Sequence, residues 1–315
     1  TTRLVGSEMC IRDRRSTPSL PGRAARLPRV RRWDRIMGLN ARNQLIARAN
    51  PPQAVRLVND KVATKRVLTA HAVPVADTLL VIDSRRRLAG LDPASLPDSF
   101  ALKPSQSLGG SGILLAARRD ASGDGWESAS GRPISVADVR EHVRCILDGE
   151  YSPRGDDVAF VEPLIHAHPV LDEMSFRGLP DIRVICVDDR PLTAMLRLPT
   201  SASGGRANLH QKAIGASVDL ATGTVERAWM DGRSIDTHPD TGKRLTGRRV
   251  PHWARVIDAA RRCSAATGLR YLGADVVVDA DRGPLLLEVN ARPGLQIQNV
   301  TGRGLLDILP PEVAA

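Results

Sequence analysis

The sequence has few aromatic residues, few cysteines and no long apolar run. Aromatic side chains make up 3% of the 315 residues, and no stretch approaches the roughly 20 apolar residues that cross a bilayer, which excludes a membrane-spanning protein. The four cysteines, Cys10, Cys145, Cys186 and Cys263, form no CxxC motif or Cys/His cluster, so neither a disulfide framework nor a structural zinc site is indicated. We therefore expect a globular, cytoplasmic protein from a reducing compartment.

Lysine is also scarce, because the chain has 40 arginines and only five lysines: Lys61, Lys65, Lys103, Lys212 and Lys243. A chain this rich in arginine is expected to keep lysine where a compact ammonium group is required. Lys103 ends a predicted strand and precedes the loop SQSLGGSG, whose small residues would let backbone amides approach phosphate oxygens. The alternative is a surface lysine beside a flexible hairpin tip.

Positive charge is concentrated at one end of the chain. The net charge is +10, but residues 1–36 alone contribute +7 and the rest of the chain carries only +3. The string LVGSEMCIRDR at 4–14 is similar to a translated sequencing adapter, so we expect residues 1–36 to be a disordered, artefactual leader before a start at Met37. The isoelectric point of 10.3 therefore does not predict specific binding of nucleic acid.

Hydrophobic periodicity in the rest of the chain predicts an α+β fold with antiparallel sheets, because the strands come in hairpin pairs. Helices are expected at about 59–72, 135–147 and 252–267. Strands are expected at about 77–83, 99–104, 112–117, 157–165, 181–187, 192–198 and 216–220, followed by a hairpin of 271–279 and 284–290. We expect an irregular segment at 40–52 and a polar linker at 120–133.

The final hairpin carries the strongest chemical signal. If Asp279 pairs with Pro284 across the loop, then Asp275 lies directly opposite Glu288, and Asn290 lies diagonally on the same face. Two facing carboxylates between valines and leucines would repel each other, and a divalent cation relieves that repulsion. This oxygen-only set suits Mg²⁺. The alternative is a solvent-facing polar stripe on a half-exposed hairpin.

Six segments occur in the order found in ATP-grasp ligases: DK (60–61), LKPSQSLGGSG (102–112), FVEPLI (160–165), DIRV (181–184), GGRANLH (204–210) and GAD…LLLEVNARPG (273–294). Over about residues 37–308 the chain resembles the RimK-type α-L-glutamate ligases, and among them the α-L-glutamate ligase-related proteins. The resemblance implies an ATP-grasp fold, in which two α+β subdomains with antiparallel sheets grip ATP between them.

The resemblance also implies a division of the chain. We expect an N-terminal segment at 37–58, an ATP-grasp domain at 59–308 and a tail at 309–315. Within the domain, a small lid subdomain covers about 77–158 and a larger metal-site subdomain about 159–308. The full N-terminal domain that usually precedes this fold in RimK-type ligases is expected to be missing, so part of the substrate site would come from elsewhere.

ATP with Mg²⁺ or Mn²⁺, two ions in all, are the implied cofactors. The residues that match ATP-binding positions are Lys61, Lys103, Gly109, Gly110, Ser111, Gly112, Glu162, Pro163, Leu164, Ile165, Asp181 and Asn208. In the family the two lysines hold phosphates, the glycine loop covers them, the segment at 162–165 binds adenine, and Asp181 contacts the ribose or nucleotide. Asp275, Glu288 and Asn290 match the metal ligands.

The implied activity is the ATP-dependent ligation of a carboxylate to an amine through an acyl phosphate. Arg183, Arg197 and Arg206 are candidates to stabilise the transferring phosphoryl group, with surface solvation as the alternative. His210 would orient substrate or, equally, cap a loop. Arg292 stands where the ribosomal-protein ligases have serine, and it could clamp a substrate carboxylate, which points to an acidic substrate.

The expected partners are small-molecule or peptide acids and amines, without specific nucleic acid or membrane insertion. Self-association is frequent in the family and is a further expectation. Two alternatives to the glutamate-ligase-like activity remain at this point. One is an ATP-grasp protein that binds nucleotide without ligating, and the other is a ligase that acts on a sugar, cell-envelope or peptide natural-product acceptor.

Overall fold

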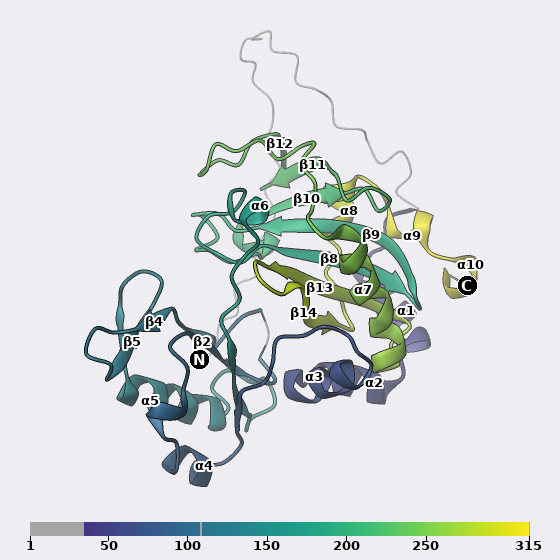
Figure 1. Ribbon diagram of the computed structural model, residues 1–315. Helices are drawn as coiled ribbons and strands as arrows, with labels where there is room; N and C mark the ends of the chain where they lie inside the picture. Colours follow the sequence, from purple (N-terminus) through teal and green to yellow (C-terminus); the bar gives the residue numbers. More distant parts are fainter. Residues whose placement is uncertain (1–34, 108, 315) are drawn as a thin grey trace, which may run out of the picture.

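The computed structural model describes residues 35–107 and 109–314, so residues 1–34 of the expected leader lie outside the described residues. Figure 1 shows a larger body built on one long sheet and a smaller body formed by the chain between about residues 80 and 160. All strand pairs within the sheets are antiparallel, which confirms the expected α+β architecture.

The large sheet has seven strands and is packed on one face against a long helix. In spatial order the strands are β12 (Arg233–Ile235), β11 (Val225–Met230), β10 (Ile214–Val218), β9 (Arg190–Leu198), β8 (Asp181–Val187), β13 (Tyr271–Asp279) and β14 (Gly283–Asn290). Ala274, Val276 and Val278 alternate along β13 and are buried in the same core as residues of α7 (Trp253–Thr267). The intervening residues, among them Asp275, therefore face the other side of the sheet.

The smaller body has a four-stranded sheet in the order β1 (Leu80–Ile82), β7 (Ala159–Pro163), β2 (Phe100–Pro104) and β3 (Leu114–Ala116). Helix α5 (Val136–Leu147) packs on it, with the short α4 (Arg85–Ala89) beside it. A capping box starts α5, because the Ser135 side chain accepts from Asp138 N and the Asp138 carboxylate accepts from Ser135 N. A short 3-10 turn, η2, lies at Pro93–Ser95.

The expected polar linker at 120–133 is wrong, because this segment folds into part of a third sheet. That sheet consists of β4 (Arg118–Arg119), β5 (Gly125–Glu127) and β6 (Pro133–Ser135). Trp126 is fully buried, meets the ring of Phe100 edge-on at 5.3 Å, and donates its indole N–H to Pro97 O at 3.0 Å. One buried indole thus outweighs the loop-like composition around it.

The expected irregular segment at 40–52 is wrong as well, since α1 (Leu39–Ala49) occupies most of it. Leu45 and Ile46 of α1 are buried against Tyr271 in a second core behind the large sheet. Asn50 follows the helix and joins it to β13, because its Nδ2 donates to Tyr271 O at 2.7 Å and its Oδ1 accepts from Tyr271 N at 2.9 Å. Tertiary packing therefore stabilises a helix whose composition is mostly polar.

Two further helices lead into the smaller body. They are α2 (Pro52–Val58) and α3 (Lys61–Ala70), and Asp60 caps α3 by accepting from Ala63 N at 2.9 Å. The remaining short helices are α6 (Pro169–Asp172), η3 (Leu209–Gln211), α8 (Ile297–Thr301), α9 (Leu305–Ile308) and α10 (Pro311–Ala314). Among the helices described for residues 35–107 and 109–314, none is long and apolar enough to cross a membrane.

Candidate active site

The hairpin of β13 and β14 brings the two predicted carboxylates face to face, since Asp275 pairs with Glu288. The turn itself differs from the expectation, because Asp279 pairs with Gly283 and not with Pro284. Gly283 has φ of +77°, which glycine tolerates, and the Asp279 carboxylate closes the turn by accepting from Arg282 N at 2.9 Å. A bulge between Asp275 and Val276 then shifts the register by one residue and restores the predicted pair.

Asp275 is buried and its carboxylate lies between two arginines. Arg183 donates from Nε to Oδ1 at 2.7 Å and from Nη2 to Oδ2 at 2.6 Å, while Arg197 Nη2 donates to Oδ2 at 2.8 Å. Asn290 Nδ2 also donates to Oδ2, at 3.1 Å, which leaves the amide oxygen of Asn290 for another partner. Burial opposes ionisation of Asp275, but the charges of Arg183 and Arg197 outweigh it and lower the pKa of this carboxyl.

Asp181, at the start of β8, is bound by Arg197, which also donates to Asp275. Arg197 Nη2 donates to Asp181 Oδ2 at 2.7 Å and Arg197 Nε donates to Oδ1, so both carboxylate oxygens have a guanidinium partner. Burial raises the pKa of Asp181 to about 6, with the charge of Arg197 opposing the shift. The predicted contact of Asp181 with nucleotide stays a prediction, and the observed contact of Asp181 is with Arg197.

Glu288 is the least compensated carboxylate of the group. Within residues 35–107 and 109–314, no group donates a hydrogen bond to its oxygens. Burial raises the pKa of Glu288, the neighbouring charge of Asp275 raises it further, and the charge of Lys61 opposes both. A divalent cation would relieve this destabilisation, so the carboxylate pair and the amide oxygen of Asn290 fit a Mg²⁺ ion.

The oxygen set is nevertheless small. Among the described residues, no cluster of three or more histidine, cysteine, aspartate or glutamate side chains could hold a metal ion by itself. An ion at Asp275, Glu288 and Asn290 would therefore take further ligands from water or phosphate, as Mg²⁺ usually does. The assignment of these three residues as metal ligands remains a prediction.

Three of the five lysines, Lys61, Lys65 and Lys103, lie close to buried carboxylates of the site. Glu162 on β7 lies between two of them, because Lys65 Nζ donates to its Oε2 at 2.6 Å and Lys103 Nζ donates to its Oε1. Burial opposes ionisation of Glu162, but the charges of Lys103 and Lys65 lower its pKa below the usual value. The bridge connects α3 of the larger body to β2 and β7 of the smaller one.

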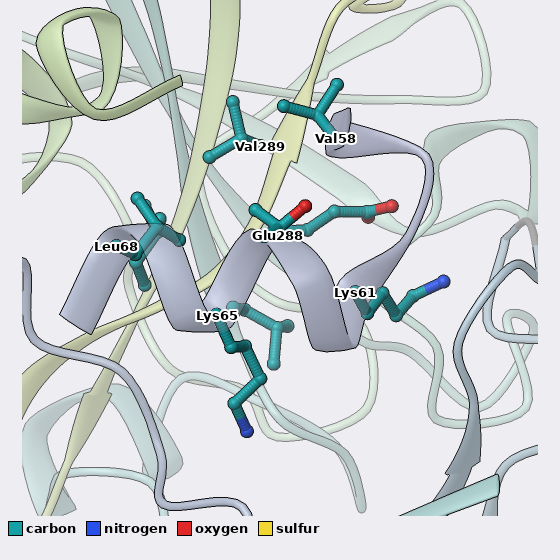
Figure 2. A pocket seen from close by; sticks show the side chains of 9 residues that line it. Val58, Lys61, Lys65, Leu68, Glu288 and Val289 are labelled. Carbon is teal, nitrogen blue, oxygen red and sulfur yellow. The ribbon is translucent and has the colours of Figure 1, made fainter. Parts of the chain in front are cut away.

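Lys61 leaves α3 one turn before Lys65 and takes a different direction. Figure 2 shows Lys61 extending to the side of α3 where the Glu288 carboxylate lies, whereas Lys65 points away from Glu288. Lys61 Nζ donates to Ser107 O at 2.6 Å, at the start of the glycine-rich loop. Burial lowers the pKa of Lys61, and the charge of Glu288 opposes that shift.

The glycine-rich loop joins β2 to β3. Gly109, Gly110 and Gly112 all have positive φ, which explains why small residues without a Cβ occur there. A Cβ on Gly112 would lie 2.5 Å from Tyr151 Cγ, so this glycine is also required by close packing. The stem of the loop is fixed by Asp157, which accepts from Gln106 N at 3.0 Å. Ser111 lies in the same turn.

The segment after Glu162 continues from β7 toward the large sheet. Pro163 ends β7, and Leu164 O accepts a hydrogen bond from Arg282 at 3.5 Å. Ile165 packs with a group of apolar side chains on the same face as Asp275, which we call the apolar cluster. The apolar cluster consists of Ala76, Ile165, Leu179, Val277, Leu285 and Leu287.

Four predicted site residues lie outside this group of contacts. Arg206 is exposed, and Asn208 Oδ1 accepts from His210 N at 3.1 Å, which caps η3. His210 Nδ1 is 3.3 Å from Gln296 Nε2. Arg292 is exposed and lines a cleft of about 370 Å³ together with Glu288 and Asn290. The structure therefore does not join Arg206, Asn208 or His210 to the carboxylates through any contact described for the chain.

Sequence reasoning missed two residues of the site. Lys65 was among the five scarce lysines but had no motif, and its partner Glu162 lies 97 positions away. Arg154 lines the cleft from a loop after α5, and no sequence signal distinguishes it among 40 arginines. Lys65 could have been found from the scarcity of lysine alone.

The structure has two bodies with antiparallel sheets, and its carboxylate hairpin faces the lysines and the glycine-rich loop. This arrangement is that of the ATP-grasp fold. Residues 40–310 match the profile of the sugar-transfer associated ATP-grasp family, and the chain belongs to that family. The RimK-type subgroup stays a prediction. A search among curated proteins finds no match.

Solved structures with this fold include three ligases. D-alanine–D-alanine ligase from Bacillus anthracis, complexed with ATP, is 14% identical with a TM-score of 0.49, over 83% of this chain and 67% of the ligase. The ATP-grasp ligase PsnB, complexed with a precursor variant, Mg and ADP, is 15% identical with a TM-score of 0.43, over 82% and 57%. D-cycloserine synthetase DcsG is 16% identical with a TM-score of 0.41, over 78% and 66%.

Proposed function

We propose that this protein is an ATP-dependent carboxylate–amine ligase that activates an acid as an acyl phosphate. The observation that carries the proposal is the Asp275–Glu288 pair, which lies beside Lys61 and near the Lys65–Glu162–Lys103 bridge. Mg²⁺ held by Asp275, Glu288 and Asn290 would supply charge neutralisation for the phosphate oxygens.

The chain offers separate surfaces for the parts of ATP. The apolar cluster suits the adenine ring, and the backbone groups of Leu164 and Ile165 lie at its edge. Lys61 and Lys103 would hold the phosphates, and the amides of Gly109–Gly112 would cover them; Lys61 Nζ already donates to Ser107 O at the start of this loop. Supporting this order, the apolar Leu287 and the carboxylate of Glu288 are adjacent on β14.

The proposed reaction has two balanced steps. A substrate carboxylate oxygen attacks the γ-phosphorus of ATP, the bond to the β–γ bridging oxygen breaks, and ADP leaves. An amine nitrogen then attacks the acyl carbon, inorganic phosphate leaves, and the nitrogen loses a proton. Arg183 and Arg197 both have an Nη1 group outside their bonds to Asp275 and Asp181, and these groups would stabilise the oxyanions that form.

The family description adds one class of acceptor to the candidates. Because the family is sugar-transfer associated, an acid or amine linked to a sugar or to the cell envelope is the second candidate beside free glutamate. PsnB was solved with a precursor peptide, so a peptide acceptor is a further candidate. The motifs at 160–165 and 285–294 support kinship with the RimK-type group.

Trapping with hydroxylamine tests the proposal without knowledge of the natural amine. Hydroxylamine captures acyl phosphates as hydroxamates, so Mg²⁺-ATP is incubated with glutamate, peptides and acidic sugars, and ADP and hydroxamate are measured together. We expect equal amounts of both with at least one acid, and their loss in Glu288→Gln with the circular dichroism spectrum unchanged.

The matched control is Glu127→Gln, which removes a carboxylate that pairs with exposed Arg118 on the third sheet. This variant should retain full activity. ATP binding without ADP or hydroxamate across the panel would support the alternative of a nucleotide-binding protein that does not ligate. Unchanged turnover in Glu288→Gln would overturn the role of the carboxylate pair.

A further inference from the structure

The cleft of about 370 Å³ beside Glu288 has a volume in the range of small-molecule sites, roughly 300–1,000 Å³. Its walls come from several elements: the α2–α3 junction, the start of the glycine-rich loop, the loop at 153–154 and the end of β14 with the residues that follow. Arg154 and Arg292 therefore line one cavity from two different bodies of the protein.

The cleft lies beyond the carboxylates as seen from the apolar cluster. Leu285 and Leu287 belong to the apolar cluster, Glu288 and Asn290 follow on the same strand, and Arg292 comes after the strand ends. Strand residues advance by about 3.3 Å each, so Leu285 and Asn290 are separated by roughly 16 Å. If the nucleotide base lies at the apolar cluster and the phosphates lie at Lys61 and Glu288, the far end of the cleft, at Arg154 and Arg292, is left for another substrate.

The cleft favours an anion. Lys61 and Glu288 in its lining belong to the proposed phosphate and metal site, so the charges that remain for another ligand are the two positive charges of Arg154 and Arg292. Lys61 already donates to Ser107 O, but neither Arg154 nor Arg292 has a side-chain hydrogen bond or ion pair with any described residue. Both guanidinium groups keep all their donors for a ligand, and guanidinium matches carboxylate in bidentate geometry.

The lining also limits the size and polarity of that ligand. Besides the charged groups it consists of small or polar side chains and contains no aromatic ring: Val58, Asn59, Gln106, Ser107, Pro153, Val289, Asn290 and Ala291. A bulky apolar substrate would find little surface to bury there. A compact, strongly polar molecule fits this lining better.

We infer that the acid substrate carries a second carboxylate, besides the one that is activated, and that Arg154 and Arg292 hold this second group across the cleft. This inference rests on the proposed ligase function for its statement about which carboxylate reacts. Because the two arginines come from different bodies, the bound dicarboxylate also draws the smaller body toward the large sheet. Arg154 is thus a specificity residue supplied by the smaller body.

Direct binding tests the inference separately from catalysis. Calorimetric titrations with Mg²⁺ and a non-hydrolysable ATP analogue present compare two pairs of probes: L-glutamate with L-glutamine, and succinate with succinamate. Each pair differs only in whether the second group is charged. We expect the dicarboxylate of at least one pair to bind about tenfold more tightly than its amide, as a charged bidentate contact allows.

Single variants locate the preference. Arg154→Ala and Arg292→Ala should each remove most of the preference for the dicarboxylate, and Arg154→Lys and Arg292→Lys should restore part of it. Arg233→Ala, which deletes an exposed arginine on β12, should leave it intact. Affinity for the ATP analogue alone should be the same in all of these variants.

Three outcomes would overturn the inference. These are a wild-type protein with no preference in either pair, a preference that survives both alanine variants, or a parallel loss of affinity for the ATP analogue, which would assign the arginines to the triphosphate. A charge preference that is present while no acid yields hydroxamate would support the anion site and refute the ligase proposal instead.

Discussion

Replacing Glu162 by glutamine isolates the charge that joins the two bodies. The Glu162 side chain is 5% exposed, and its partners Lys65 and Lys103 are 11% and 12% exposed. Glutamine has nearly the same shape, so Glu162→Gln removes the negative charge and leaves two ammonium groups largely out of water. Solvent screening is weak at this exposure, and the effect on the free energy of unfolding should be large.

Removal of one partner from a buried ion pair typically costs about 3–5 kcal/mol. Because both lysine side chains keep some exposure and can move toward water, we expect the lower end, about 3 kcal/mol at pH 7. Exposed pairs contribute no more than about 1 kcal/mol, so the two cases are well separated. Glu127→Gln, whose partner Arg118 is 65% exposed, is the control.

The pH dependence has a defined sign. The pKa of Glu162 is lower in the folded state than in the unfolded state, so its contribution is present above the unfolded value of about 4.5 and is lost as pH falls through the folded pKa. Burial lowers the pKa of Lys65, and loss of Glu162 would lower it further. The variant should therefore regain stability as rising pH deprotonates Lys65. The difference between the two proteins should be greatest near neutral pH and smaller at both extremes.

Urea unfolding followed by circular dichroism from pH 4 to 10 measures this difference. The midpoint of Glu162→Gln should fall clearly below that of the wild type at pH 7, and that of Glu127→Gln should not. A Glu162→Gln variant as stable as the wild type, or a deficit that is constant across the pH range, would refute the reasoning. Either result would mean that the ammonium groups of Lys65 and Lys103 are hydrated by water when the Glu162 carboxylate is absent.

Three other changes probe the site and its scaffold. Lys103→Met should weaken ATP binding about tenfold or more in a titration, while Lys243→Met, at an exposed position, should not. Gly112→Ala places a methyl group 2.5 Å from an aromatic carbon at φ +72° and should weaken ATP binding by displacing the loop, whereas Gly109→Ala, with open space around it, should have a smaller effect. Asn50→Ala leaves three backbone groups at the start of β13 without partners and should cost about 3 kcal/mol in urea unfolding.

Each of these predictions has a result that would contradict it. Equal ATP affinity in the Lys103 and Lys243 variants would separate Lys103 from the phosphates. Equal effects at the two glycines would mean that backbone conformation matters and the close approach to Tyr151 does not. A small loss of stability in Asn50→Ala would show that water replaces the amide.

The Asp275–Glu288 pair could be predicted by counting residues back from the turn of the hairpin. The prediction was correct although the hairpin deviates from regular pairing at two places. The turn closes one residue tighter than expected at Gly283, and a bulge beside Asp275 adds the residue back. Neither deviation has a signal in the alternation of valine and leucine. Counting from the hairpin therefore gave the correct pair only because the tighter turn and the bulge offset each other.

The arginines around Asp275 could not be positioned by sequence alone. Arg183 pairs across β8 and β13 with Asp275, and Arg197 pairs with Asp181 in the register of β8 and β9. These registers join strands that are up to 92 positions apart in sequence. Their expected place on strands that face the site made Arg183 and Arg197 catalytic candidates, but their pairing with Asp275 and Asp181 could be seen only in the assembled sheet.

The charged side chains around Asp275 and Glu288 also determine when a metal ion can bind. The expectation from the sequence was two repelling carboxylates whose repulsion a cation relieves, whereas the structure gives Asp275 and Asp181 arginine partners. The charges of Lys61, Arg183 and Arg197 act on Glu288 as well, but burial and the charge of Asp275 still raise its pKa. The three acids and three bases balance, so a divalent ion alone finds no excess of negative charge at this site. A nucleotide triphosphate would supply that excess. We therefore expect Mg²⁺ to bind together with ATP, with Glu288 as the protein ligand that most gains from its arrival.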